Sequence, residues 1–382
     1  MPSNVTSLPQ RPTCAEINLE NLAHNFRVIK AAVGSAVAIM PAVKADAYGH
    51  GAVACAQVLE KEGAAWFAVA LPEEGVKLRQ AWIAKPILAL GGFWDGQETL
   101  LIEHNITPVI FRLDLLDRLN HAARQAGVTF DYHVKVDTGL GRLGVPYAEF
   151  ENFLSEIKAF QNLRLDGLMT HCASADAADG VEFTEHQLKL FNHALTMVNQ
   201  HGFNPRWIHA ANSGAAHGFP EARHNLVRLG GVLWGIWRDS TRSDIAPLDW
   251  RPVMRLQTQI MLLKTVPSGT PLGYGGTFKT GRESRIATLA IGYEDGLPRA
   301  LSNRGRVLVR GQFAPIVGRI SMDLTLVDVT DVADATLGDE VVIIGRQGEQ
   351  EITAEEIAAQ IDTISYEITC GISDRVPRIY TR

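Results

Sequence analysis

A single lysine, Lys44, ends an apolar stretch and is followed by groups that suit an anion. Residues 36–43 read AVAIMPAV, which predicts a buried strand, and residues 48–51 read YGHG, a tyrosine before a turn that opens a helix. A charged amine at the end of a buried strand is costly unless it is paired or used chemically. The simplest chemical use is a Schiff base with an aldehyde cofactor, so Lys44 is the candidate attachment site.

Later apolar stretches also end in residues that complement a phosphorylated aldehyde. Residues 137–144 read DTGLGRLG, a glycine-rich loop that presents Arg142, and residues 212–216 read NSGAA, a small-residue turn that opens a helix. His171 ends another stretch, and Arg228 lies in the last one. Each signal is weak alone, because such residues commonly cap helices or form ordinary ion pairs. Together they predict an anion cradle beside two arginines and a histidine.

These residues meet only if the apolar runs form one sheet. The runs are residues 36–44, 66–70, 87–90, 107–111, 131–136, 164–170, 207–211 and 225–229. Helical patterns separate most of them. Alternation of strands and helices predicts a closed (β/α)8 TIM barrel, in which all carboxyl ends of the strands lie at one face. An open doubly wound sheet is the competing fold, and the absence of G-x-G-x-x-G after the first strand disfavours it.

The pattern changes near residues 246–252, which contain two prolines and no helical period. Beyond them, runs rich in Val, Ile and Thr are broken by Gly and Pro, which predicts a smaller, mostly β domain. One helix is expected there, where Thr353 and Glu356 have the spacing of a capping box. The predicted α/β chain thus has three parts: an N-terminal extension (1–13), a barrel (14–245) and a C-terminal β domain (246–382).

The composition favours a cytoplasmic enzyme that acts on a small molecule. The net charge is −6 with no basic block, which argues against nucleic acid or an anionic membrane as the main partner. No signal-peptide pattern and no apolar stretch of about 18 residues occur. The four cysteines have no metal-binding spacing, so no metal is expected. Cys172, beside His171, is interpreted as a structural thiol, because adjacent strand residues point to opposite faces.

The motifs resemble, in order, those of the alanine racemase family. Residues 43–51 resemble its pyridoxal phosphate lysine motif, with Asp46 where asparagine is usual. Further matching motifs are residues 135–144, 170–171, 211–215, 273–275, 291–296, 318–323, 366–368 and 375–378. The resemblance spans nearly the whole chain, although Gly231, Trp234 and Glu294 depart from the usual family residues. A series of motifs in one order is far more specific than any single motif.

The resemblance implies a homodimer with pyridoxal phosphate in each barrel and with active sites shared between subunits. Lys44 would bind the cofactor and act as a base on one face of the substrate α-carbon, and Tyr274 of the partner subunit would act on the other face. His171 and Arg228 would stand behind Tyr274, with Arg228 facing the pyridine nitrogen and keeping His171 neutral. The implied reaction is the interconversion of L-alanine and D-alanine.

The other implied residues bind the cofactor or substrate, or line the path to them. The cofactor phosphate would be bound by Tyr48, Ser213, Gly230 and Tyr366. Arg142 would contact the cofactor and the substrate carboxylate, assisted by the backbone N–H of Met322 from the partner. Tyr293 and Asp323 would line the entry passage. Lys135 is carbamylated in part of the family, where it orients the arginine matching Arg142; the alternative is an ordinary strand lysine.

Three other functions are weighed beside alanine racemisation. A racemase for serine, lysine or another larger amino acid would use the same scaffold, and the sequence does not separate it from an alanine enzyme. A pyridoxal phosphate carrier without racemase activity would resemble the barrel alone, so a second domain bearing Tyr274 and Met322 argues against it. A decarboxylase with a similar barrel is disfavoured, because it would be expected to carry other residues in its β domain.

Overall fold

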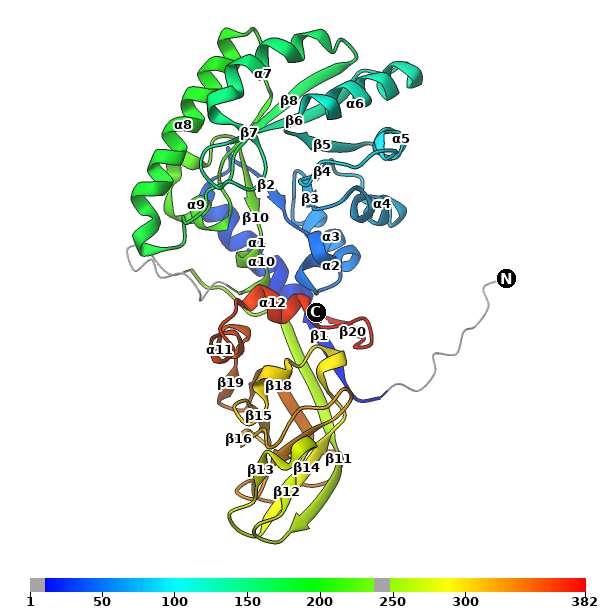
Figure 1. Cartoon of the computed structure of the whole chain (residues 1–382), viewed down its shortest axis with the longest axis vertical. Helices are drawn as coiled ribbons and strands as arrows, with labels where there is room; N and C mark the ends of the chain where they lie inside the picture. The colour runs from blue at the N-terminus through cyan, green and yellow to red at the C-terminus, as the bar shows by residue number, and fades with distance from the viewer. Residues whose placement is uncertain (1–10, 237–247) are drawn as a thin grey trace, which may run out of the picture. The chain divides into compact units, whose positions relative to one another are not determined.

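The computed structural model describes residues 11–236 and 248–382, and the chain forms two compact units (Figure 1). One unit is Leu19–Arg251, and the other combines Met1–Asn18 with Pro252–Arg382. Each unit has its own sheet system, because none of the named sheets mixes strands of both units among the residues described. We refer to them as the barrel unit and the β unit.

The β unit takes a segment that the sequence analysis assigned to the barrel. Strand β1 (Cys14–Asn18) pairs antiparallel with β11 (Met254–Val266) and parallel with β20 (Arg378–Thr381). The expected barrel start at residue 14 therefore differs from the structure, because backbone hydrogen bonds tie this strand to the β unit. The expected boundary between residues 245 and 246 lies outside the described residues.

The barrel unit is organised around parallel strands that follow one another in a ring. Within the described residues these are β2 (Ala38–Pro41), β3 (Phe67–Val69), β4 (Ile87–Ala89), β5 (Ile106–Ile110), β6 (Phe130–Asp137), β8 (Leu163–Met169), β9 (Trp207–His209) and β10 (Leu226–Leu229). Strands β3-β4-β5-β6-β8-β9 form one sheet, and β10 pairs with β2. Two contacts close the ring: the Arg228 N–H donates to the Ala211 carbonyl at 3.0 Å, and Ala42 bridges Ala68. All eight predicted strands and the predicted barrel are confirmed.

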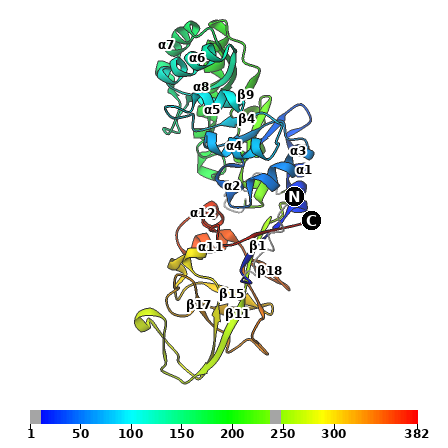
Figure 2. The same cartoon turned by 90° about the vertical axis from the view of Figure 1, so that its right-hand side faces the viewer.

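Helices follow the strands and surround the ring in both views (Figures 1 and 2). Their bounds are α1 (Leu19–Val33), α3 (Ala52–Lys61), α4 (Pro72–Gln80), α5 (Glu98–Glu103), α6 (Leu113–Ala126), α7 (Phe150–Glu156), α8 (Val181–Gln200), α9 (Ser213–Gly218) and α10 (Gly231–Trp234). Helix α6 shows why they lie there: it buries Leu115, Leu116, Leu119 and Ala123, which recur at the spacing of one helical face. A short strand, β7 (Val145–Pro146), pairs with β6 outside the ring order.

An apolar cluster fills part of the barrel interior. It includes Met40, Trp66, Leu88, Val109, Met169 and Leu226, which come from six different strands or their flanks and are almost fully buried. Burying one such side chain contributes about 1.5–3 kcal/mol relative to leaving it exposed. This packing fixes the strands relative to one another, and so fixes the positions of the polar residues at their carboxyl ends.

The β unit is mostly β, as predicted. A nine-stranded sheet runs in the order β16-β15-β18-β11-β1-β20; off this order, β14 pairs with β11, β17 pairs with β14, and β19 pairs with β18. The strands not yet bounded are β14 (Ser284–Leu289), β15 (Arg306–Val309), β16 (Gln312–Pro315), β17 (Thr325–Asp328), β18 (Glu340–Gln347) and β19 (Gln350–Ile352). Helix α11 (Ala354–Gln360) begins where expected, because the Thr353 hydroxyl accepts the Glu356 N–H at 3.1 Å. The β unit also contains helix α12 (Ser365–Cys370), the hairpin of β12 (Pro271–Leu272) and β13 (Phe278–Lys279), and the turns η5 (Tyr274–Gly276), η6 (Tyr293–Asp295) and η7 (Arg299–Leu301).

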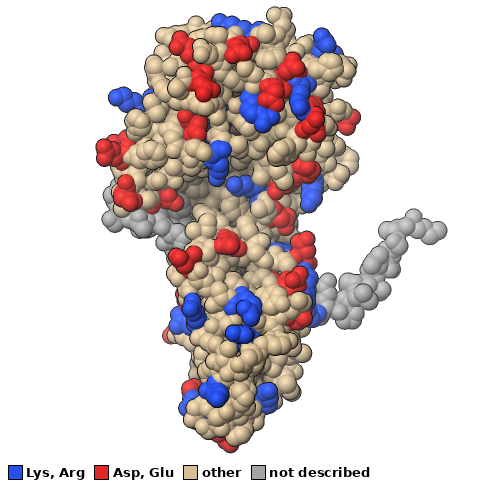
Figure 3. All heavy atoms as spheres, in the orientation of Figure 1, with Lys and Arg blue, Asp and Glu red and all other residues tan. Residues whose placement is uncertain are grey.

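Acidic and basic side chains are interspersed on the faces of both units shown in Figure 3. Across the ranges described, no helix combines the length and apolar character needed to cross a bilayer. A search of the same ranges finds no group of three or more His, Cys, Asp or Glu residues placed to hold a metal ion. Cys14, Cys55, Cys172 and Cys370 form no disulfide bonds with one another.

Candidate active site

Lys44 opens a left-handed turn directly after β2, labelled α2 (Lys44–Tyr48) in Figure 1. The φ angles of the next four residues, Ala45 to Tyr48, are 51°, 51°, 56° and 55°. This conformation costs about 1–2 kcal/mol per residue for L-amino acids, and consecutive residues rarely share it. Strain of this kind persists where surrounding contacts overdetermine it, commonly at functional sites.

Side chains on both sides hold the left-handed turn in place. The Ala45 N–H donates to the Glu74 carboxylate at 2.7 Å, and the Ala52 N–H donates to Asp46 Oδ1 at 2.8 Å. The ring of His50 is buried, and its Nδ1 atom lies 2.9 Å from the Ala47 carbonyl oxygen. Asp46 thus places a carboxylate at the start of α3, where negative charge is favourable. This contact gives a physical role to the aspartate that departs from the family motif.

Ser213, Gly230 and Tyr48 meet beside this turn. The Gly230 N–H donates to the Ser213 hydroxyl at 2.9 Å, and Ser213 is buried. A Cβ atom at Gly230 would lie 2.6 Å from the Tyr48 hydroxyl oxygen, so a larger residue would displace that hydroxyl. The Tyr48 ring packs on the buried ring of Trp234, with centroids 5.8 Å apart. Two hydroxyls and a close backbone approach suit a phosphate group.

Arg228 is buried in β10, and its guanidinium is fixed by neighbouring acceptors. It donates to the carbonyl oxygens of Thr170, His209 and Ala210 at 2.7, 2.7 and 2.9 Å. It also donates to His209 Nδ1 at 2.9 Å and lies 3.4 Å from His171 Nδ1. Burial lowers the pKa of Arg228 to about 10, so the group is still charged at neutral pH. A charged guanidinium can only donate, so an atom that binds it must accept.

His171 is neutral at physiological pH, because its pKa is held well below the ordinary value. Burial is the largest cause, followed by the positive charges of Arg228, Lys135, Arg142 and Lys44. The sequence analysis attributed this neutrality to the arginine alone, and the structure adds desolvation as the larger cause. The four cations act on one imidazole because the barrel brings the carboxyl ends of their strands together.

Two buried histidines behind Arg228 were not expected from the sequence. Since Arg228 donates to Nδ1 of His209, that ring must carry its proton on Nε2, which lies 2.9 Å from Nδ1 of His133. Burial lowers the pKa of His133 to about 3 and that of His209 well below its ordinary value, so both are neutral. The available signal was a histidine within each of two apolar strand runs. His209 thus contacts the Arg228 guanidinium from the barrel interior, and His133 supports His209.

Gly167 makes room for this histidine pair. A Cβ atom there would lie 2.5 Å from the His133 ring. We expect Gly167→Ala to destabilise the protein by about 1–3 kcal/mol, the usual cost of overpacking a core. Urea unfolding measures the loss. The matched control is Gly281→Ala, where the new atom would meet nothing within 4 Å; its expected change is within about 0.5 kcal/mol. Equal losses in the two variants would contradict this account.

Lys135 and Arg142 lie at the end of β6 and in the loop after it. Lys135 is buried, and desolvation together with nearby arginines lowers its pKa to about 8. The Asp137 carboxylate accepts the N–H groups of Gly139 and Gly141 at 2.9 and 3.2 Å, which shapes the loop that presents Arg142. Arg142 also lines a hollow of about 690 Å³. The loop therefore presents an exposed cation near a poorly solvated amine.

The remaining expected residues belong to the β unit. Tyr274 lies in η5 with 71% of its surface exposed, and Met322 is 50% exposed. Tyr293 lies in η6, and Asp323 accepts a hydrogen bond from an arginine of the same unit. Tyr366 lies in α12. The structure thus brings together the expected residues of the barrel unit and, separately, shows those of the β unit on accessible turns or a short helix.

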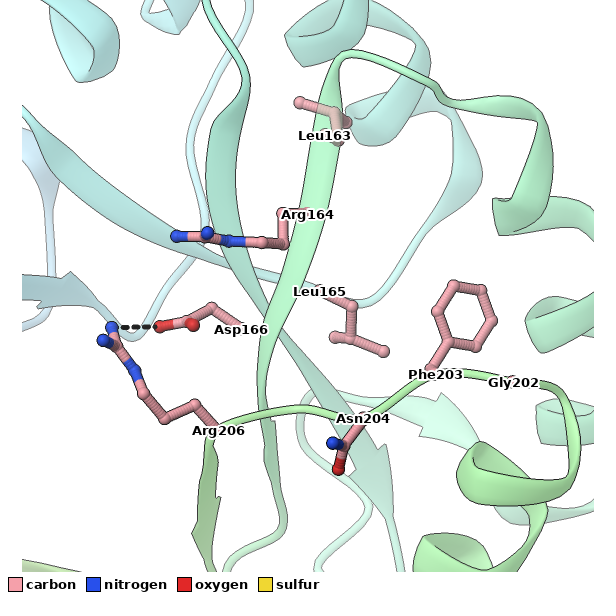
Figure 4. A pocket seen from close by; sticks show the side chains of 8 residues that line it. All are labelled: Leu163, Arg164, Leu165, Asp166, Gly202, Phe203, Asn204 and Arg206. Atoms are coloured by element: carbon pink, nitrogen blue, oxygen red, sulfur yellow. Dashed lines mark hydrogen bonds and ion pairs between the residues drawn. The ribbon is translucent and has the colours of Figure 1, made fainter.

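A second hollow, of about 450 Å³, lies at the start of β8 and is not the candidate site (Figure 4). Its two arginines already have carboxylate partners: Arg206 lies 3.0 Å from Asp166, and Arg164 makes two contacts of 2.6 Å with Asp131. The candidate site lies at the other end of the same strand, beyond Met169. The charges that line this hollow are therefore neutralised within the chain.

Taken together, the barrel residues have the chemistry of a pyridoxal phosphate site. They supply an amine on Lys44, hydroxyl donors on Ser213 and Tyr48, and a fixed cationic donor on Arg228. The close approach at Gly230 leaves a small-residue surface beside the hydroxyls. The amine can react with an aldehyde, the hydroxyls can bind a phosphate, and the guanidinium can donate to a ring nitrogen.

Comparison with known proteins gives one consistent match. The family descriptions "Alanine racemase, N-terminal domain" and "Alanine racemase, C-terminal domain" fit residues 17–237 and 253–380. The chain is 45% identical to an alanine racemase of Halothermothrix orenii over 370 residues, which cover 97% of both chains. A Bacillus anthracis alanine racemase with bound L-Ala-P superposes with a TM-score of 0.92 at 34% identity, covering 98% of this chain and 96% of that one. One from Bartonella henselae with covalently bound pyridoxal phosphate gives 0.87 at 29% identity, covering 97% and 99%.

Proposed function

This chain belongs to the alanine racemase family of isomerases, and from that premise we propose that it interconverts L-alanine and D-alanine with pyridoxal phosphate as cofactor. The observation that carries the proposal is the convergence of Lys44, Ser213 and Arg228 with a neutral His171 at one end of the barrel. The Bartonella relative, which carries the same cofactor covalently, supports it.

Different residues bind different parts of the cofactor in this proposal. Lys44 is the covalent anchor, and the hydroxyls of Tyr48 and Ser213 bind the phosphate together with Gly230; Tyr366 adds a further hydroxyl. Arg228 would bind the pyridine nitrogen as a donor. Bound pyridoxal phosphate supplies an electron sink that acidifies the α-proton of an amino acid. Because Arg228 keeps its own proton at neutral pH, it would donate a hydrogen bond to the ring nitrogen without protonating it, which we expect to limit side reactions.

Two bases on opposite faces of the α-carbon complete the reaction. The Lys44 amine removes or returns the proton on one face, and the phenol of Tyr274 of the partner subunit does so on the other. The high exposure of Tyr274 leaves it accessible to a second chain. A tyrosine with an ordinary pKa near 10 is a poor base. Because Arg228 donates to Nδ1 of His171, the neutral ring would carry its proton on Nε2 and donate it to the Tyr274 oxygen, which stabilises the phenolate.

The substrate carboxylate is bound by the guanidinium of Arg142 and by the backbone N–H of Met322 from the partner. Tyr293 and Asp323 line the passage through which substrate enters. This arrangement requires a homodimer, because Tyr274 and Met322 belong to the β unit and act on the other chain's barrel. A monomer would lack the second base.

The function is tested with purified protein, L-alanine or D-alanine, and added pyridoxal phosphate. Either enantiomer is expected to give the same equal mixture, because enantiomers have equal free energies. A panel of enantiopure amino acids then measures substrate breadth, which separates alanine from serine or lysine as the preferred substrate. Carbon dioxide as the main product would assign the chain to a decarboxylase, and cofactor binding without turnover would assign it to a carrier.

Lys135 is proposed to be carbamylated. Its pKa of about 8 leaves much of the amine neutral at mildly alkaline pH, and only a neutral amine attacks carbon dioxide. The neutral amine forms one N–C bond to carbon dioxide as one C=O π bond opens, and it releases one proton. Counted from the ammonium form, two protons leave, and a cation becomes an anion that pairs with Arg142. We expect ¹³C-labelled bicarbonate to give a carbamate NMR signal that grows from pH 6 to about pH 9. The signal should be absent from Lys135→Ala, whose KM for alanine should rise about tenfold.

The matched control for Lys135 is Lys158→Ala, which removes an exposed lysine of the same unit. This variant should keep both the NMR signal and the wild-type KM. A carbamate signal that survives Lys135→Ala would place the modification elsewhere. An unmodified Lys135 in an active enzyme would leave Arg142 to be oriented by its glycine-rich loop alone.

A further inference from the structure

A buried carboxylate, Asp295, stands behind the turn that carries Tyr293. Its side chain is fully buried and accepts the Gly292 N–H at 2.9 Å. Arg11 donates to it from both terminal guanidinium nitrogens, Nη1 and Nη2; the Nη1 contact measures 3.0 Å. Arg375 approaches from another side, with Nε 3.6 Å from Oδ1. A buried carboxylate needs such partners, because an unpaired charge in a low-dielectric interior is strongly unfavourable.

The Asp295 turn is bound directly to the turn that carries Met322. The Tyr293 N–H donates to the Ser321 carbonyl and the Glu294 N–H donates to the Met322 carbonyl, both at 3.0 Å. Gly292 permits this approach, because a Cβ atom there would lie 2.3 Å from the Met322 carbonyl oxygen. A displacement of either turn would therefore move the other.

The charged groups extend this connection to Asp323. Arg375 donates to the Asp323 carboxylate at 2.8 Å while it lies beside Asp295. Two arginines and two carboxylates thus alternate in a chain without net charge, from Arg11 to Asp323. The far end of the chain is the turn of Met322 and Asp323, and its centre is the turn of Tyr293.

Arg11 is held in a defined place and is not a loose terminal residue. Its Nη1 also donates to the Ala290 carbonyl at 3.3 Å. Thr13, two residues later, donates to the same carbonyl at 2.5 Å and lies 2.8 Å from the hydroxyl of Thr258 on β11. The sequence analysis gave residues 1–13 no part in the site. The structure instead ties Arg11 and Thr13 to the turn of a proposed entry residue.

We propose that Arg11 is a positioning residue: through Asp295 and Arg375 it sets the Tyr293 and Met322 turns in the arrangement that receives the substrate carboxylate. The role of those turns rests on the proposed function. Arginine suits the task because its planar fork engages both carboxylate oxygens, whereas lysine offers a single point charge. Arg11 would then determine part of the substrate site without touching substrate.

The test compares Arg11→Gln with Arg282→Gln in the full-length protein. Arg282 also pairs with an aspartate of the β unit, Asp331, but both side chains are largely exposed. Hydrogen exchange at the Tyr293 and Glu294 amides is expected to accelerate at least about tenfold in Arg11→Gln and to stay unchanged in Arg282→Gln. KM for alanine should rise about tenfold in Arg11→Gln, with kcat within about threefold of wild type. Arg11→Lys should recover part of both effects.

A variant that leaves a buried carboxylate unpaired can fail to fold, so Arg11→Gln with Asp295→Asn is made alongside it. The asparagine keeps an acceptor for Gly292 and removes the uncompensated charge. If Arg11 positions the turns, this double variant folds, yet its two amides still exchange faster and its KM stays raised. Wild-type exchange in Arg11→Gln, or full recovery of exchange and KM in the double variant, would overturn the proposal. A wild-type protein inactive toward alanine would reject the proposed function, while the exchange comparison would still decide the role of Arg11.

Discussion

Lys44→Ala is expected to abolish racemisation, with kcat lowered by about 10⁴-fold or more, and to remove the visible absorbance of bound cofactor. Two losses combine in this one change: the covalent anchor disappears, and the base on one face of the α-carbon disappears with it. The measurement pairs an absorbance spectrum with a racemisation assay in each direction. Both directions should fail, because each requires a proton transfer at Lys44.

The control for Lys44 is Lys77→Ala, which removes an exposed lysine from α4 of the same unit. Its spectrum and rate should match wild type. The unfolding midpoint of Lys44→Ala should lie close to that of the wild-type protein without cofactor, since the left-handed turn is held by Glu74 and Asp46. Substantial racemisation by Lys44→Ala would reject this lysine as the base and the anchor.

Tyr274→Phe is expected to slow racemisation by about 10²–10⁴-fold and to affect the two enantiomers differently. The phenol acts on one face only, so exchange of the α-proton for solvent deuterium should be lost from one enantiomer and retained from the other. Proton NMR in deuterated water measures both exchanges directly. Wild-type exchange from both enantiomers would remove Tyr274 from the mechanism. A visible spectrum like that of wild type would show that cofactor binding survives.

Mixing the Lys44→Ala and Tyr274→Phe proteins tests whether the tyrosine acts between subunits. In a mixed dimer, one site combines the intact lysine of one chain with the intact tyrosine of the other. After random exchange, about a quarter of wild-type activity should return, because half of the dimers are mixed and each has one good site. If the tyrosine acted within its own chain, every site would carry a defect and no activity would return.

The sequence predicted the strands of the barrel and the residues at their ends because these signals are local. A run such as residues 36–43 is apolar whatever surrounds it, and burial of such runs in a parallel sheet follows from their composition. The same holds for Thr353, whose hydroxyl begins α11 as its spacing with Glu356 indicated. Lys44, Ser213 and Arg228 could be named as site candidates because parallel strands in a barrel must present their carboxyl ends together.

Tertiary contacts decided the features that no local pattern contained. Strand β1 joined the β unit through pairing with β11 and β20, which lie far away in sequence. His133 and His209 became a pair because β6 and β9 both flank β8, and Gly167 of β8 has no side chain to fill the space. Arg11 binds Asp295, which lies 284 positions away in the sequence. Such contacts depend on the packed arrangement, which periodicity does not encode.

The turn after Lys44 shows most clearly which features depend on local sequence and which depend on tertiary contacts. The sequence by itself predicted that a lysine follows a buried strand, that a tyrosine suited to an anion comes after it, and that an aldehyde cofactor is the simplest use of the amine; family motifs then specified pyridoxal phosphate. It did not indicate a left-handed turn, because Ala45, Asp46 and Ala47 ordinarily favour other conformations. Contacts with Glu74 and with the start of α3 offset that unfavourable backbone energy. Only the folded barrel brings those groups to the turn, so only tertiary structure could set its conformation.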